Sequence, residues 1–240
     1  MTVRRFDHHG ATLVAEEHGA GPRVFVLIHG IGMGRTVFAD LIDHLLPYGR
    51  VVAVDLPGYG EAPEPPRTPT MERNADVVAA FLRDRGIVRP VLVGHSMGTQ
   101  VVVEVAARHP GVAGAAALIG PTVDPSERTA VCQLARLAQD LLIESPRVIV
   151  AGAREYLRAG PHLRRKMRAM LVHRPERTYP RVRIPVLVLR GEHDRVVSRE
   201  WAQEVVRLLP DGTYAEVEGH GHETMIRDAA PTARAIVTAL

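Results

Sequence analysis

A serine at position 96 stands between two glycines in the sequence GHSMG, residues 94–98. An apolar run precedes this segment and a helix-like pattern follows it. Where a strand turns sharply into a helix, the turn residue is strained and its neighbours must be glycine, because larger side chains would clash. Such a turn lifts the hydroxyl clear of the sheet, beside helix N-terminal N–H groups that stabilise negative charge. The pattern predicts that Ser96 is a nucleophile.

A serine hydroxyl is a poor nucleophile unless a histidine, itself oriented by a carboxylate, removes its proton. Two segments after Ser96 carry such groups at the ends of apolar runs. The first, VLVLRGEHD, ends in Asp194, and the second, YAEVEGHGHET, contains His220 and His222. The chain order serine, acid, histidine fits a nucleophile, its orienting acid and its base.

Five short segments of the chain are together far more specific than any one of them. They are IHGIG at 28–32, DLPGYGEA at 55–62, GHSMG at 94–98, RGEHD at 190–194 and GHGH at 219–222. With these segments the chain resembles the α/β-hydrolase-fold family over nearly its whole length. The resemblance implies a capped serine hydrolase that needs no cofactor.

The resemblance also assigns the roles of the triad. Ser96 is the nucleophile, Asp194 the orienting acid and His222 the base, because the family's last loop usually reads Gly-x-Gly-His. Two alternatives stay open. His220 is a rival base, and Asp124 is a rival acid, since some family members place the acid after the preceding strand.

The same resemblance places the oxyanion hole at the backbone N–H groups of Ile31 and Met97. One such donor typically contributes about 10²–10³ in rate. His29 and His95 are expected to be structural: the first shapes the oxyanion turn and the second fills the variable position before the serine.

Short apolar runs bounded by Gly, Pro or Asp predict strands that are buried on both faces, as in a parallel sheet. These runs are 24–30, 51–58, 91–96, 115–121 and 185–194, with an edge hairpin over 2–6 and 11–17 and a last strand at the start of 214–224. Helical patterns occupy 35–47, 70–86, 97–110, 199–210 and 231–240. The alternation predicts an α/β fold with a doubly wound, mostly parallel, eight-stranded sheet and helices on both faces.

The region 121–180 breaks this alternation, because it contains helical patterns and no convincing strand. It predicts a helical cap inserted into a core made of 1–120 and 181–240. Apolar residues of the cap are expected to roof the pocket or to pack the cap helices: Leu134, Leu137, Leu141, Leu142, Tyr156, Leu157, Met167, Met170 and Leu171. The cap is basic, with eleven Lys and Arg against six Asp and Glu, and a solvated helical face is the expected explanation. The alternative is that the basic residues at 164–166 contact an anionic substrate or an acyl carrier.

The composition excludes several classes of protein. The net charge is only +3 and aromatics make up 4% of residues, so nucleic-acid binding is not expected. We expect no membrane span and no signal peptide, which favours the cytoplasm, and Arg, Ala and Val richness points to a bacterium. Cys132 is the only cysteine, so no intramolecular disulfide can form.

No metal site and no dinucleotide site is expected. The scattered histidines lack the spacing of metal ligands, and His220 and His222 have no supporting cluster of carboxylates or cysteines. The segment HGIGMG at 29–34 lacks the G-x-G-x-x-G spacing of a dinucleotide fingerprint.

The expected function is hydrolysis of a carboxylic ester or thioester of a small-to-medium hydrophobic substrate, through an acyl-enzyme on Ser96. Three alternatives remain: hydrolysis of a carbon–carbon bond in a diketone-like substrate, a cofactor-free biosynthetic lyase or cyclase, and a non-catalytic module that binds a small molecule. The oligomeric state is not readable from the sequence.

Overall fold

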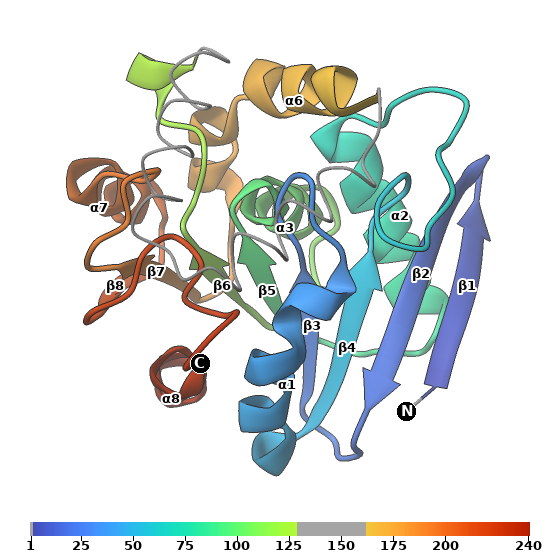
Figure 1. The fold of residues 1–240 in the computed structure, drawn as a ribbon, viewed down its shortest axis with the longest axis horizontal. Helices are drawn as coiled ribbons and strands as arrows, with labels where there is room; N and C mark the ends of the chain where they lie inside the picture. Colours follow the sequence, from blue (N-terminus) through green and yellow to red (C-terminus); the bar gives the residue numbers. More distant parts are fainter. Residues whose placement is uncertain (1, 129–161) are drawn as a thin grey trace.

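The computed structural model describes residues 2–128 and 162–240. Eight strands form one sheet in the spatial order β1-β2-β4-β3-β5-β6-β7-β8 (Figure 1). The strands are β1 (Thr2–His8), β2 (Ala11–His18), β3 (Val24–Ile28), β4 (Arg50–Asp55), β5 (Val91–His95), β6 (Ala115–Ile119), β7 (Val186–Gly191) and β8 (Gly212–Val217). Strand β2 pairs antiparallel with β1 and β4, and all other neighbours pair parallel. The predicted mostly parallel, eight-stranded sheet is confirmed.

The edge hairpin forms where the sequence predicts it. Strands β1 and β2 pair from Thr2↔Glu17 to His8↔Ala11. Two residues join them, and both have positive φ, 48° at His9 and 77° at Gly10. Positive φ at both central residues is typical of the two-residue turns that match the twist of a hairpin.

Each central strand is buried on both faces. In β3, Val24, Val26 and Ile28 belong to one hydrophobic cluster, whereas Phe25 and Leu27 belong to the other. Alternation between two buried layers explains why these strands are continuous apolar runs rather than alternating ones.

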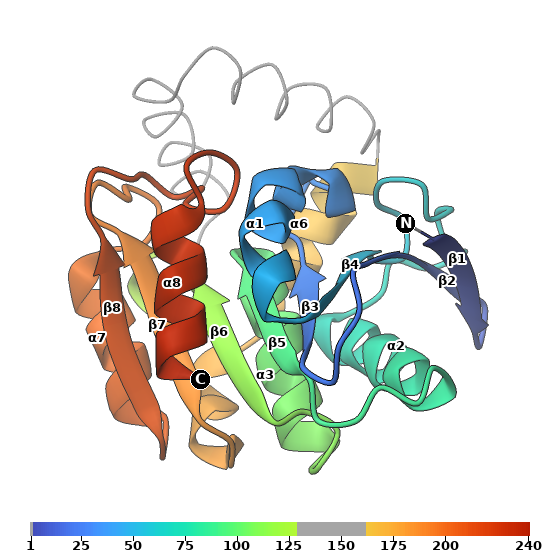
Figure 2. The same ribbon diagram turned by 90° about the horizontal axis from the view of Figure 1, so that it is seen from below.

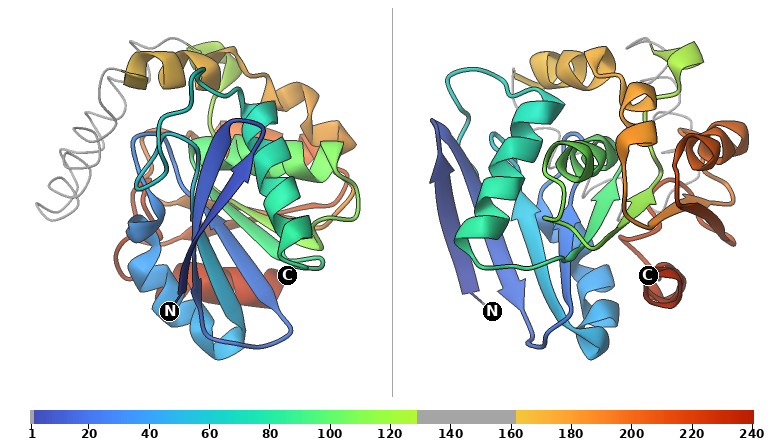
Figure 3. Two further views of the ribbon diagram at one scale, coloured as in Figure 1. Left: turned by 90° about the vertical axis from the view of Figure 1, so that its right-hand side faces the viewer. Right: turned by 180° about the vertical axis from the view of Figure 1, so that it is seen from behind.

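Helices cover the two faces, as predicted. They are α1 (Ala39–Leu45), α2 (Met71–Asp84), α3 (Met97–Arg108), α6 (Leu163–Val172), α7 (Arg199–Leu208) and α8 (Ala230–Ala239). Helices α1 and α8 lie on one face, and α2, α3 and α7 lie on the other (Figure 2). Helix α6 lies beyond α2 and α3, on the side away from α1 and α8 (Figure 3).

The helix predicted over 35–47 is divided in three. A 3-10 turn, η1 (Arg35–Phe38), precedes α1, and a second, η2 (Leu46–Tyr48), follows it. Its buried side chains include Phe38, Leu41 and Leu45, whereas Val37 is only partly buried. Arg35 is anchored to Asp55, and Pro47 lies in the first turn of η2, so neither end continues the α-helix.

The predicted cap lies largely in residues 129–161, outside the described residues, as do Leu134, Leu137, Leu141, Leu142, Tyr156 and Leu157. Met167, Met170 and Leu171 do lie in the described part, and they pack against the hydrophobic core. None of the described helices combines the length and apolar character that crossing a membrane requires.

The direction in which successive strands are added to the sheet reverses around β3. The chain runs from β3 to β4 on one side, and then to β5 on the other. In doubly wound sheets, the crevice at the carboxyl ends of the strands on either side of such a reversal is the usual site for ligands. Here those ends carry His29, Gly30, His95 and Ser96.

A buried ion pair holds the loop after β4. The carboxylate of Asp55 accepts hydrogen bonds from the backbone N–H of Arg35 at 2.6 Å and of Glu61 at 3.0 Å, and it also pairs with the Arg35 guanidinium. The same guanidinium bonds to Glu16 at 2.8 Å, so this network ties β2, the end of β4 and η1 together.

We expect Asp55→Asn to lower the free energy of unfolding by about 3–5 kcal/mol, because it leaves a buried guanidinium without its closest counter-charge. Urea denaturation measures the loss. The control is Asp76→Asn, whose partners Arg108 and His109 lie at the surface, and whose loss should be about 1 kcal/mol or less. Equal losses in the two variants would contradict a structural role for the buried network.

Candidate active site

Ser96 occupies a strained turn between β5 and α3. Its backbone has φ 52° and ψ −118°, a region that non-glycine residues rarely adopt. Its N–H donates to the carbonyl oxygen of Ile119 at 2.9 Å, and its own carbonyl oxygen accepts from the Thr99 N–H and hydroxyl at 3.0 and 2.6 Å. These bonds hold the turn against its strain.

The flanking glycines are required by close backbone approach. A Cβ on Gly94 would lie 2.7 Å from the carbonyl carbon and oxygen of Gly98. A Cβ on Gly98 would fall inside the van der Waals distance of the Ile28 carbonyl oxygen. Helix α3 therefore begins directly against the carboxyl end of β3, and both positions exclude any side chain.

The structure brings Asp194 and His222 together. His222 Nδ1 lies 2.9 Å from Asp194 Oδ2, and both side chains are buried. The other carboxylate oxygen of Asp194 accepts from the N–H groups of Val196 and Val197, each at 2.8 Å. An ionised carboxylate can only accept, so Nδ1 carries the proton and Nε2 is the basic nitrogen of the ring.

His222 lies beside the Ser96 turn. Its ring centre is 4.9 Å from that of His95, the residue before Ser96, and its carbonyl oxygen is 3.3 Å from His95 Nε2. On another side, a Cβ on Gly120 would meet His222 Cε1 at 2.6 Å. The imidazole thus lies between the ends of β5 and β6, on the edge of the sheet that carries Ser96.

The rival acid and base are bonded elsewhere. His220 bonds to the carbonyl oxygens of Glu218 at 2.8 Å and Asp228 at 3.2 Å. Asp124 caps the 3-10 turn η3 (Pro125–Glu127), where it accepts from the N–H and hydroxyl of Ser126. These contacts give both residues local structural roles.

The two expected oxyanion donors flank the serine. Met97 is the first residue of α3, so its N–H has no partner within the helix. Ile31 lies in the turn after β3, and that turn packs on the serine: a Cβ on Gly30 would lie 3.2 Å from the Ser96 Cβ. His29 shapes this turn, because its Nδ1 donates to the Gly30 carbonyl oxygen at 2.7 Å and its Nε2 accepts from the Leu56 N–H at 3.1 Å.

His95 is held in its neutral form. Its side chain is fully buried, and this desolvation, together with the neighbouring His222, places its pKa well below the usual value. A neutral ring whose Nε2–H donates to the His222 carbonyl oxygen fits the expected structural role, and it steadies the loop that carries the base.

Two residues near the site, Tyr59 and Lys166, receive no catalytic role from the sequence patterns. The Tyr59 ring packs against His29 with centroids 5.0 Å apart, and its hydroxyl lies 3.4 Å from Met97 Sδ. Lys166 of α6 lies over the same ring at 4.4 Å, and it binds Glu64 at 2.8 Å and the carbonyl oxygen of Gly58. Helix α6 is thereby anchored to the loop beside the oxyanion turn.

The expectation that the basic residues of the cap lie on a solvated helical face is wrong for Lys166, because its side chain is only 2% exposed. The available signal is helical spacing: Lys166 shares a face with Met167 and Met170, both buried. Among the described residues, no group of three or more His, Cys, Asp or Glu could hold a metal ion.

Comparisons with known proteins agree on the fold. A family model described as the alpha/beta hydrolase family matches residues 25–235. The 2-(acetamidomethylene)succinate hydrolase of Mesorhizobium japonicum is 26% identical over 249 residues, covering 91% of this chain and 88% of that protein. A 2-hydroxy-6-oxononadienedioate/2-hydroxy-6-oxononatrienedioate hydrolase of Burkholderia vietnamiensis is 37% identical over 107 residues, covering 42% of this chain and 37% of that protein.

A solved structure supports the same fold over the whole chain. The thermophilic esterase of Thermogutta terrifontis superposes with a TM-score of 0.85, at 22% identity, over 99% of this chain and 97% of that one. At this identity the likeness establishes the architecture, and the chemistry has to be argued from the site.

We expect Gly120→Ala to slow cleavage of p-nitrophenyl butyrate, which reports on a reactive serine, by on the order of 10²-fold, because the new methyl group displaces the His222 ring. Steady-state kcat/KM measures the effect. Gly111→Ala is the matched control: Gly111 also has positive φ, 83°, but nothing lies within 4 Å of its Cβ position. An equal rate loss in both variants would show that backbone strain alone is responsible.

Proposed function

Because the chain belongs to the alpha/beta hydrolase family, we propose that it is a serine hydrolase that cleaves a carboxylic ester or thioester through an acyl-enzyme on Ser96. The observation that carries this proposal is the 2.9 Å hydrogen bond between His222 Nδ1 and Asp194 Oδ2, with the His222 ring packed beside the Ser96 turn. A buried carboxylate that fixes the tautomer of a histidine next to a strained serine is the arrangement that nucleophilic catalysis requires.

In the first half-reaction, Ser96 Oγ attacks the carbonyl carbon of the substrate while His222 Nε2 takes the hydroxyl proton. The carbonyl oxygen becomes an oxyanion, which accepts hydrogen bonds from the backbone N–H groups of Met97 and Ile31. Asp194 stabilises the imidazolium by its charge and its hydrogen bond. The bond to the leaving alkoxide or thiolate then breaks, and His222 returns the proton to that group.

In the second half-reaction, a water molecule repeats the attack on the acyl-enzyme. His222 takes one proton from the water as its oxygen bonds to the acyl carbon, and the same oxyanion hole holds the charge. Collapse of this intermediate breaks the bond to Ser96 Oγ, which recovers its proton from His222. The products are a carboxylic acid and the free enzyme.

A small-to-medium hydrophobic acyl or ester group remains the proposed substrate class. Its support is the set of apolar residues that the sequence predicts for the cap, and most of these lie outside the described residues. The cap is proposed over 121–180, between the two parts of the core, 1–120 and 181–240. Met167 and Met170 pack into the hydrophobic core, so they support the placement of α6 rather than contact with substrate.

Hydrolysis of a carbon–carbon bond in a diketone-like substrate is the second candidate function. It uses the same three residues, and one of the relatives is named for hydrolysis of an oxo-dienedioate. A panel of p-nitrophenyl esters, acyl thioesters and diketones compares kcat/KM for the classes, and the class with the highest value identifies the reaction.

The triad is tested by three substitutions. We expect Ser96→Ala, His222→Gln and Asp194→Asn each to lower kcat for p-nitrophenyl butyrate by on the order of 10⁴-fold or more, because nucleophile, base and orienting acid act as one unit. Stopped-assay kinetics on folded, purified variants give the values.

The rival residues supply the controls. His220→Gln and Asp124→Asn make the same chemical changes at the positions that compete for the roles of base and acid, and both should retain a rate close to that of the unaltered protein. If His220→Gln or Asp124→Asn abolished turnover while its counterpart left it intact, the proposed assignment would be wrong.

A further inference from the structure

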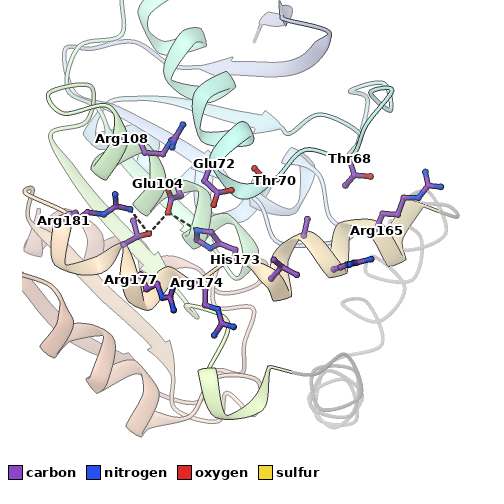
Figure 4. Close-up of a pocket in the computed structure, with 14 residues that line it drawn as sticks. Thr68, Thr70, Glu72, Glu104, Arg108, Arg165, His173, Arg174, Arg177 and Arg181 are labelled. Carbon is purple, nitrogen blue, oxygen red and sulfur yellow. Dashed lines mark hydrogen bonds and ion pairs between the residues drawn. The ribbon is translucent and has the colours of Figure 1, made fainter.

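A hollow lies between α6 and the helices α2 and α3. It has a volume of about 610 Å³, within the range of small-molecule sites. Its walls come from the start of α2, the later turns of α3, α6 and the 3-10 turns η5 (Pro175–Arg177) and η6 (Tyr179–Arg181) (Figure 4). We refer to it as the arginine groove, because six arginines line it: Arg108, Arg165, Arg168, Arg174, Arg177 and Arg181.

Neither carboxylate of the groove, Glu72 or Glu104, forms an ion pair with these arginines among the described residues, although the charge of Arg181 helps to lower the pKa of Glu104. Glu104 is buried and bonded internally, to His173 Nε2 at 2.9 Å and to the Thr178 hydroxyl at 2.5 Å. Burial opposes its ionisation, but these hydrogen bonds, together with the charge of Arg181, outweigh burial and lower its pKa. Glu72 lies in the first turn of α2, where the helix dipole also favours a negative charge.

The arginines differ in their partners. Arg108 forms a two-point pair with Asp76 at 3.1 Å, and Arg174 lies 3.8 Å from Glu176. Arg165, Arg168 and Arg177 are exposed and form no ion pair with any residue in 2–128 or 162–240. Guanidinium groups that line one hollow from separate elements carry like charges, and an anion seated there is attracted to each of them.

The charges are distributed along the groove. Figure 4 shows Arg165 on α6 at one end and Arg181 at the other, with Glu104 and His173 between them. On α6, Arg165 and Arg168 are three residues apart and share a face with Val172, whose side chain is 66% exposed. The groove therefore offers cations at both ends and an apolar contact along one wall.

We propose that the arginine groove binds a small organic polyanion, a molecule with two or more phosphate or carboxylate groups, at a site separate from Ser96. Arg165 and Arg168 contact one anionic group, and Arg177 contacts another. Guanidinium groups bind both kinds of oxyanion through paired N–H donors, so phosphate and carboxylate share this recognition. Val172 packs against the carbon skeleton that joins the anionic groups.

The test is isothermal titration of the full chain with inorganic tripolyphosphate and, separately, with citrate. We expect saturable one-to-one binding of at least one probe, tighter by on the order of tenfold than binding of inorganic phosphate, because two anionic groups are engaged at once. The probe that binds more tightly identifies whether the groups are phosphates or carboxylates.

A triple variant assigns the binding to the groove. Arg165→Gln, Arg168→Gln and Arg177→Gln together should weaken binding by on the order of tenfold or more. The matched control replaces Arg5, Arg89 and Arg234 by Gln. These arginines are exposed and lie outside the groove, so the control removes the same number of charges without altering it. Circular dichroism verifies that both variants are folded.

Loss of affinity confined to the groove variant supports the proposal. Failure of both probes to saturate the unaltered protein would overturn it. Equal weakening in the two triple variants would also overturn it, since that result reports only the total charge. Neither outcome depends on Ser96 chemistry, so the groove and the proposed hydrolase activity are tested separately.

Discussion

The close approach of α3 to the carboxyl end of β3 is the constraint on which the rest of the site depends. Gly98 lies against the Ile28 carbonyl oxygen, and Gly94 against Gly98, so neither position has room for a Cβ. The turn between them must therefore be tight, and Ser96 takes φ 52°. Strain of this kind costs on the order of 1–3 kcal/mol, and the hydrogen bonds to Ile119 and Thr99 offset it. The tight turn brings Ser96 beside the first N–H of α3 and the turn after β3.

Asp194 and His222, the other half of the site, lie at the same edge of the sheet as Ser96. Asp194 follows β7 and His222 follows β8, and parallel pairing brings both loops to the edge where β5 ends. Every described contact of the Asp194 carboxylate orients it: two backbone N–H groups hold one oxygen, and His222 Nδ1 holds the other. His95 joins the halves, since it precedes the serine and donates to the His222 carbonyl oxygen. The geometry is thus set by backbone and buried polar groups rather than by flexible side chains.

The sequence predicts much of this arrangement, because a strand that is buried on both faces is a continuous apolar run in the sequence. Apolar runs locate the central strands, and the two glycines around Ser96 identify the turn. Contacts between residues far apart in the chain produce no such local pattern. The basic composition predicts a solvated face for Lys166, but its partners Glu64 and Gly58 lie about a hundred positions earlier in the chain. The helix predicted over 35–47 is divided because Arg35 is held by Asp55, a contact that periodicity does not record. The arginine groove likewise collects residues between positions 68 and 181 that no local pattern connects.

We propose that the strained turn presents an activated serine. Intact-mass spectrometry after treatment with a fluorophosphonate tests it most directly, because this reagent forms a stable covalent bond with serines that a neighbouring base has activated. We expect a single adduct on the unaltered protein, mapped to Ser96 by peptide analysis and absent from Ser96→Ala. A folded protein that forms no adduct, or an adduct that persists in Ser96→Ala, would contradict it.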